Sequence, residues 1–185
     1  MLTDKLIEEC GQAIMTLAQE VASTKVGDSK SVILLPSEFL TSYPDTKLKS
    51  LIDWSKESPK SKFIYVFSVQ SERTPEELLV LFREAKRNEK QKSGKRSFAR
   101  DIQASKTLYV GSSSSIGTRI GQHLGHKNET VYSMQLRHWL KPDSVTSLKI
   151  DVWKFSSDTS QSVLQAIEDH LWSRAQPMLG KQGGK

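Results

Sequence analysis

The chain has 185 residues, a mass of 20.9 kDa, a net charge of +6 and a pI near 9.4. This length suits one domain, or one domain with a helical extension. Cys10 is the only cysteine, which excludes an intramolecular disulfide framework and a four-thiolate zinc site. No apolar run approaches the roughly 20 residues that span a bilayer, and acidic residues stand where a signal peptide would be apolar. We therefore expect a soluble, cytoplasmic protein without a membrane partner, although a nuclear protein remains open.

The positive charge is concentrated in one stretch, residues 83 to 100. Such a basic segment favours a polyanionic partner, although many basic proteins bind none. The candidate nucleic-acid-binding residues are Arg83, Lys86, Arg87, Lys90, Lys92, Lys95, Arg96 and Arg100.

Residues 1–60 read as an N-terminal helical extension. Apolar residues at intervals of three and four predict an amphipathic packing helix over 2–22. The run SVILLP then predicts a short buried strand that ends at Pro36, and residues 45–58 favour a second helix. This extension would serve target recognition or dimer contact, and the sequence does not decide between the two.

The remainder, residues 61–185, alternates strand and helix signals. Residues 62–69 (KFIYVFSV) and 107–111 (TLYVG) predict strands, separated by an insert at about 71–105. Thr74 and Pro75 predict the start of a helix in the insert, which should dissolve into a basic loop around Gly94. A helix should follow Ser115 and end near Gly125.

Three further segments complete the pattern. Residues 129–140 favour a helix, with a strand as the alternative, while 147–155 predict a strand and 160–175 a helix. The expected fold is α+β (α/β), with a small, mainly antiparallel sheet flanked by helices.

Two local patterns are weak candidates for sites. The GSSSSIG turn before a helix could present N–H groups to a phosphate, but it lacks the P-loop and dinucleotide signatures, so a capped turn is the simpler interpretation. His123 and His126 stand three residues apart without a third His or Cys nearby, which argues against zinc.

Five residues beyond position 60 form a more informative set. Tyr65 and Tyr109 lie on the two predicted strands, and Arg119 and His123 lie one turn apart on the helix that follows. Glu168 lies beside the apolar stripe of the last helix, where an unpaired carboxylate is costly. Each also has a simple alternative: tyrosines that pack, an arginine in solvent, and a glutamate that reaches outward.

In this order the residues resemble the GIY-YIG nuclease family. FIY at 63–65 and YVG at 109–111 are similar to the two halves of the family motif, and SSSSIGTRIGQHL is similar to its Arg-bearing helix. AIEDHLWSRAQPMLGKQ is similar to the closing helix, which carries a glutamate. The resemblance covers roughly residues 62–182 apart from the insert at 71–105.

The resemblance implies a role for each of the five residues. Tyr65 would be the general base or relay the proton of the attacking water, and Tyr109 would position that water or the phosphate. Arg119 would stabilise the charge that develops on the phosphate, His123 would contact phosphate or assist proton transfer, and Glu168 would hold Mg²⁺ or another divalent cation. The chemistry is consistent, because phosphodiester hydrolysis needs cationic stabilisation and a hard cation prefers oxygen ligands.

Three departures from the family pattern stand out. Phe63 replaces the first glycine, the insert separates the motif halves, and Gly180 and Lys181 stand near the place of a tail asparagine.

The leading hypothesis is a metal-dependent DNA endonuclease, a hydrolase of the restriction type that would act as a homodimer. Repair and mobile-element roles, or RNA as the substrate, remain open. The alternative is a non-catalytic nucleic-acid-binding module, and a third class is a small interaction domain with an incidental basic cluster.

Overall fold

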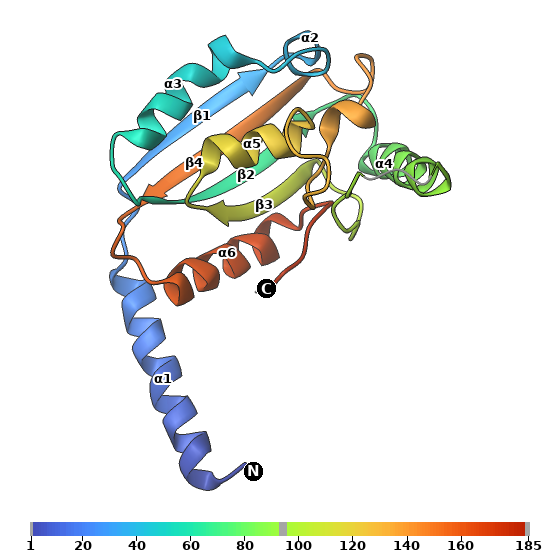
Figure 1. Ribbon diagram of the computed structural model, residues 1–185. Coiled ribbons are helices and arrows are strands. Elements are labelled where there is room, and N and C mark those ends of the chain that lie inside the picture. Colours follow the sequence, from blue (N-terminus) through green and yellow to red (C-terminus); the bar gives the residue numbers. More distant parts are fainter. Residues whose placement is uncertain (1, 93–95, 184–185) are drawn as a thin grey trace.

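A computed structural model describes residues 2–92 and 96–183, and Figure 1 shows its arrangement. Its centre is a four-stranded sheet in the order β1-β4-β2-β3, formed by β1 (Asp28–Leu34), β2 (Lys62–Gln70), β3 (Thr107–Ser113) and β4 (Ser147–Phe155). All three pairings are antiparallel. The expected α+β class is therefore confirmed.

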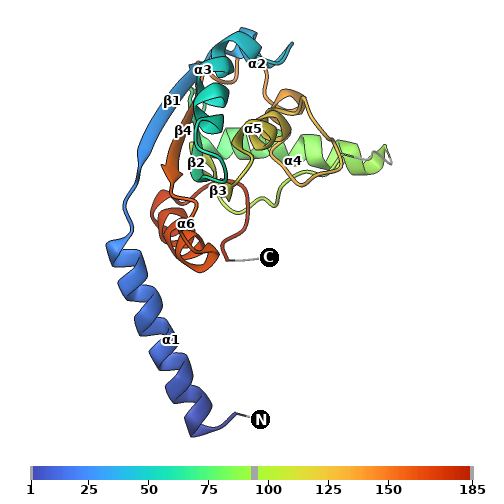
Figure 2. The same cartoon turned by 60° about the vertical axis from the view of Figure 1, so that its left-hand side comes forward.

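Helices cover the two faces of the sheet unequally, as Figure 2 shows nearly edge-on. Helices α3 (Asp45–Lys56) and α5 (Ile116–Leu124) lie on one face, over the main core that contains Phe63, Tyr65 and Phe67. Helix α6 (Gln161–Ala175) packs on the other face, against Ile64 and Phe155. Alternate residues of β2 thus point into different layers.

The insert between β2 and β3 is more helical than expected. Helix α4 (Pro75–Gln91) begins with the predicted capping box, in which the hydroxyl of Thr74 accepts from the N–H of Glu77 and the Glu77 carboxylate accepts from the N–H of Thr74. The helix continues to Gln91, past Ala85 where it was expected to give way to the basic loop, so the first part of the basic stretch lies on a helix. Figure 1 shows α4 projecting from the end of the sheet.

The division of the chain at residue 60 is corrected by the structure. Strand β1 pairs with β4 along its whole length, and α3 packs over the sheet, so residues 28–60 belong to the same α+β unit. The physical reason is the edge of β4, whose backbone groups need a partner. Helix α1 (Asp4–Ser23) alone stands apart, and none of its residues is buried, contrary to the expected packing role.

One further segment differs from its predicted structure, and one short helix was not predicted. Residues 129–140 form neither a long helix nor a strand but a loop with one 3-10 turn, η1 (Leu136–His138); the turn begins after Gln135, which has a φ of 55°. A short helix, α2 (Pro36–Phe39), follows β1. Across residues 2–92 and 96–183, no helix combines the length and the apolar character that crossing a bilayer requires.

Candidate active site

Strands β2 and β3 bring Tyr65 and Tyr109 together on one face of the sheet. Their register pairs Tyr65 with Gly111 and Phe67 with Tyr109, so the two tyrosines lie diagonally across the ladder. The rings are nearly parallel, with their centroids 6.2 Å apart. A Cβ atom at Gly111 would lie 2.7 Å from the Tyr65 hydroxyl oxygen, which explains why a glycine occupies this position.

Helix α5 carries Arg119 and His123 over these rings. The helix ends at Gly125, whose φ of 87° is a left-handed conformation that glycine adopts without strain. Its two functional side chains are four residues apart and therefore share a face. The ring centroid of His123 lies 4.4 Å from that of Tyr109 and 5.6 Å from that of Tyr65.

His123 is completely buried and is held in one tautomer. Its Nδ1 accepts the backbone N–H of Met134 at 3.3 Å, so the ring proton of the neutral imidazole lies on Nε2. Nε2 lies 3.1 Å from the Tyr65 hydroxyl oxygen and donates to it. Burial, with the neighbouring Arg119 charge, lowers the pKa of His123 well below its usual value, so this histidine is neutral.

Arg119 joins the two tyrosines. Its Nε donates to the Tyr65 hydroxyl at 3.3 Å, one terminal nitrogen reaches the Tyr109 hydroxyl at 3.5 Å, and the other donates to the Gln122 side chain at 2.9 Å. All of these acceptors are neutral. The guanidinium is half-buried, yet no ion pair within 4 Å is found for it in the described part of the chain. A half-buried cation whose hydrogen-bond acceptors are all neutral makes Arg119 a candidate for binding an anion.

Glu168 approaches the same region from α6. Burial raises the pKa of its carboxyl above the usual value, while a hydrogen bond from Ser112 and attraction to Arg119 oppose that rise. Ser112 follows Gly111 on β3, whose side chains alternate between the faces of the sheet. The Arg119 guanidinium and the Glu168 carboxylate therefore attract each other at β3, the edge strand of the sheet.

Glu168 is the candidate metal ligand of this region. Across residues 2–92 and 96–183, no group of three or more His, Cys, Asp or Glu side chains converges in a way that could hold a metal ion. Mg²⁺ is commonly held by one or two carboxylates, with waters and substrate phosphates as its other ligands. Glu168, with the neighbouring Ser112 hydroxyl, fits such an open site.

The five residues predicted from the sequence differ in how deeply they are buried. Tyr65 and His123 are 1% and 0% exposed and lie inside the core, whereas Tyr109, Arg119 and Glu168 are each partly exposed. Burial raises the pKa of Tyr65 well above that of an ordinary phenol; the adjacent Tyr109 adds to this rise and Arg119 opposes it. In this arrangement, Tyr65 meets neither water nor substrate directly.

Sequence reasoning missed Ser112, Gln122 and the backbone of Met134. The i,i+3 spacing of Arg119 and Gln122 was visible in the sequence, but the Met134 contact depends on an irregular loop. His126 does not join His123: its Nε2 donates to the carbonyl of Phe39 at 2.6 Å and its Nδ1 accepts from Arg137 at 2.9 Å. Its role is structural.

The basic residues of the insert divide into paired and unpaired groups. Arg83 and Lys86 both bind Asp101; burial opposes its ionisation, but these hydrogen bonds outweigh burial and hold the pKa of Asp101 at about 2. Arg96 binds Glu89 at 2.7 Å. The residues without an ion pair in the described part of the chain are Arg87, Lys90, Lys92 and Arg100. Lys95 lies outside the described residues.

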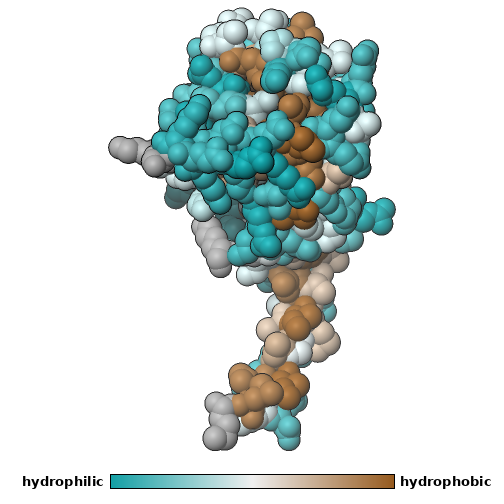
Figure 3. All heavy atoms as spheres, turned by 90° about the vertical axis from the view of Figure 1, so that its right-hand side faces the viewer, coloured by the Kyte–Doolittle hydropathy of each residue, from teal (hydrophilic) through white to brown (hydrophobic). Residues whose placement is uncertain are grey.

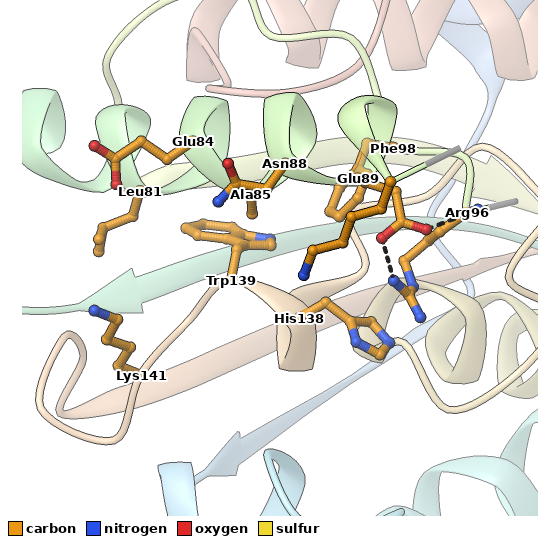
Figure 4. A pocket seen from close by; sticks show the side chains of 11 residues that line it. Leu81, Glu84, Ala85, Asn88, Glu89, Arg96, Phe98, His138, Trp139 and Lys141 are labelled. Carbon is orange, nitrogen blue, oxygen red and sulfur yellow. Dashed lines mark hydrogen bonds and ion pairs between the residues drawn. The ribbon is translucent and has the colours of Figure 1, made fainter. Parts of the chain in front are cut away.

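A polar cleft of about 380 Å³ lies beside α4 (Figure 4). The Arg96–Glu89 ion pair closes one end, Glu84 and Lys141 lie toward the other, and the Trp139 indole stands between them. The cleft separates α4 from η1 and exposes mixed charges rather than an apolar wall.

Comparison with known proteins adds no assignment. No protein-family model, curated protein or solved structure gives a significant match to the chain.

Proposed function

We propose that the protein is a metal-dependent endonuclease that hydrolyses DNA phosphodiester bonds, with a core similar to that of GIY-YIG nucleases. The observation that carries the proposal is the convergence of Tyr65, Tyr109, Arg119 and His123 in one hydrogen-bonded group, with Glu168 near Arg119. Packing alone requires neither a half-buried guanidinium without a carboxylate partner nor a carboxyl group whose pKa is raised by burial.

The difference in burial suggests that the partly exposed residues and the buried residues of the site have different roles. Arg119 and Tyr109, which are partly exposed, contact the scissile phosphate; the guanidinium stabilises the charge that develops in the transition state. Tyr65 and His123 are positioning residues, because both lie beneath Arg119 and hold its Nε in place through the Tyr65 hydroxyl. This assignment differs from the general-base role that the family resemblance implies for Tyr65.

Glu168 would hold the divalent cation, together with phosphate oxygens of the substrate and water. When bound, the ion would supply Lewis-acid polarisation of the phosphate. The attraction between Arg119 and Glu168 implies that DNA and cation bind cooperatively. The phosphate neutralises the guanidinium, and the cation neutralises the carboxylate.

DNA would be held by α4 and the segment after it. Arg87 and Lys90 lie on the exposed side of α4 without an ion pair in the described residues, so they are available to phosphates. Arg83, Lys86 and Arg96 instead hold the insert together through Asp101 and Glu89. This separates the candidate contacts, which the sequence presented as one cluster.

The test is cleavage of plasmid and genomic DNA, unmethylated and methylated, with Mg²⁺ or with EDTA. Wild type should cut only with Mg²⁺, Glu168→Ala should not cut, and Glu57→Ala, at an exposed acid after α3, should cut normally. Arg119→Lys keeps the charge but loses the forked donors, so its activity should fall ~10²-fold or more while DNA binding remains.

A different result would assign the protein to another class. Salt-sensitive DNA binding by wild type without cutting of any substrate would refute the nuclease and favour the non-catalytic nucleic-acid-binding module. Absence of both binding and cutting would refute both. Discrete fragments would show sequence specificity and support the restriction type, which acts on both strands as a homodimer.

A further inference from the structure

Helix α1 is an amphipathic helix that the rest of the chain covers only toward its C-terminal end, where Leu17 and Val21 are partly buried. It projects from the body in Figures 1 and 2, and none of its residues is buried. Leu6, Ile7 and Ile14 are 48%, 54% and 62% exposed, and Figure 3 shows apolar side chains along the projecting helix. Most of the stability of a helix in a protein comes from packing its apolar face, so the exposed stripe calls for a partner.

The spacing of the stripe is that of a coiled coil. Ile7, Cys10, Ile14, Leu17 and Val21 recur at alternating intervals of three and four residues. Gly11 lies close to this seam, and its surroundings are open, since nothing lies within 4 Å of a Cβ placed there. A second helix can therefore approach the backbone of α1 closely at its middle.

The charge of α1 indicates what kind of partner fits. The helix carries Asp4, Glu8, Glu9 and Glu20 against Lys5, whereas the whole chain has a net charge of +6. An acidic polar face is unfavourable for DNA and for an anionic membrane, both of which attract basic helices. The same face is complementary to the basic remainder of another copy of this chain.

We propose that α1 pairs antiparallel with α1 of a second copy and forms a symmetric dimer. In the antiparallel alignment that sets the two seams against each other, Cys10 faces Ile14 of the second copy and Ile7 faces Leu17 of the second copy. A twofold interface uses the same surface on both chains, and the stripe is self-complementary in this sense. Parallel pairing would instead bring the two acidic first turns side by side.

A groove at the root of α1 extends the interface. It measures about 340 Å³ and is lined mainly by apolar side chains, among them Val21, Val26, Trp153, Ile167 and Leu171. Arg174 also lines it. In the antiparallel dimer, the first turn of the second copy reaches this groove, where Leu2 of the second copy can be buried and the acidic Asp4 of the second copy meets Arg174.

The first experiment measures the mass of the full-length protein by light scattering across a dilution series. Wild type should have twice the 20.9 kDa monomer mass, and Ile14→Glu should weaken dimerisation ~100-fold or more, because the symmetric interface buries this side chain twice. Gln12→Glu, which adds the same charge on the opposite face of α1, should remain dimeric. A monomeric wild type at ~100 μM, or equal effects of the two variants, would overturn the proposal.

Disulfide trapping tests the orientation. Wild type mixed with the Cys10→Ala/Ile14→Cys double variant should form a covalent dimer on oxidation, because the antiparallel seam brings the two thiols together. Wild type alone should not cross-link. Cross-linking of wild type alone would show Cys10 facing Cys10 and overturn the antiparallel arrangement. Neither experiment depends on nuclease activity, so the dimer and the proposed function fail separately.

Discussion

Replacing Tyr65 with phenylalanine tests whether the buried network exists as hydrogen bonds rather than as packed rings. The substitution keeps the ring but removes the hydroxyl that accepts from His123 at 3.1 Å and from Arg119 at 3.3 Å. Arg119 is partly exposed and can turn to water, but the Nε2 proton of the completely buried His123 is left without an acceptor. One orphaned buried donor costs ~1–3 kcal/mol, so we expect Tyr65→Phe to lower the free energy of unfolding by that amount.

The assay is urea unfolding followed by a double-mutant cycle. Tyr65→Phe should shift the midpoint without changing the slope, and each kcal/mol corresponds to ~2–4 °C in Tm for a domain of this size. His123→Leu in the Tyr65→Phe background removes the orphaned donor, so the double variant should recover ~1–2 kcal/mol relative to additivity. Tyr132→Phe, at a tyrosine that is 72% exposed, is the control and should leave stability unchanged. Additive effects in the cycle would refute the hydrogen-bonded network.

Three other predictions address the surroundings of the site. Burial raises the folded-state pKa of Glu168, so ionisation of this carboxyl at neutral pH costs stability. Glu168→Gln should therefore raise Tm at pH 7. The difference in Tm between the variant and wild type should disappear as the pH falls below about 4.5. Gly111→Ala should lower the free energy of unfolding in urea by ~1–3 kcal/mol, because its Cβ would lie 2.7 Å from the Tyr65 hydroxyl oxygen. Arg87→Ala should reduce the slope of log affinity against log salt by about 1 in a DNA-binding titration, and an unchanged slope would exclude a phosphate contact there.

The elements that the sequence predicted well are those with strong local signals. The uninterrupted apolar run of β2, the capping box at Thr74 and the glycine at position 125 each fix a conformation with few alternatives, and all three are present. The loop at 129–140 was mispredicted because its apolar residues are held by non-local contacts. The Trp139 ring packs edge-on against Phe82, and the backbone N–H of Met134 donates to Nδ1 of His123.

The sequence predicted which residues form the candidate site but not how deeply each of them is buried. Strand alternation and helix periodicity suffice to place Tyr65, Tyr109, Arg119 and His123 on shared faces. Burial depends instead on how α5 packs across the sheet, which local sequence does not encode. The sequence therefore did not reveal that Tyr65 and His123 lie beneath Arg119, nor that the basic residues of the insert divide into paired and unpaired groups.

The burial of Tyr65 and His123 beneath Arg119 has a physical explanation. A guanidinium that must attract phosphate cannot have a carboxylate as its partner, because that carboxylate would neutralise it. Neutral acceptors must then fix its orientation. The Tyr65 hydroxyl, oriented by a histidine kept neutral by burial, meets this requirement for Arg119. The buried pair therefore preorganises the cation at little electrostatic cost, and the strongest charges remain at the surface, where DNA and a divalent ion can reach them.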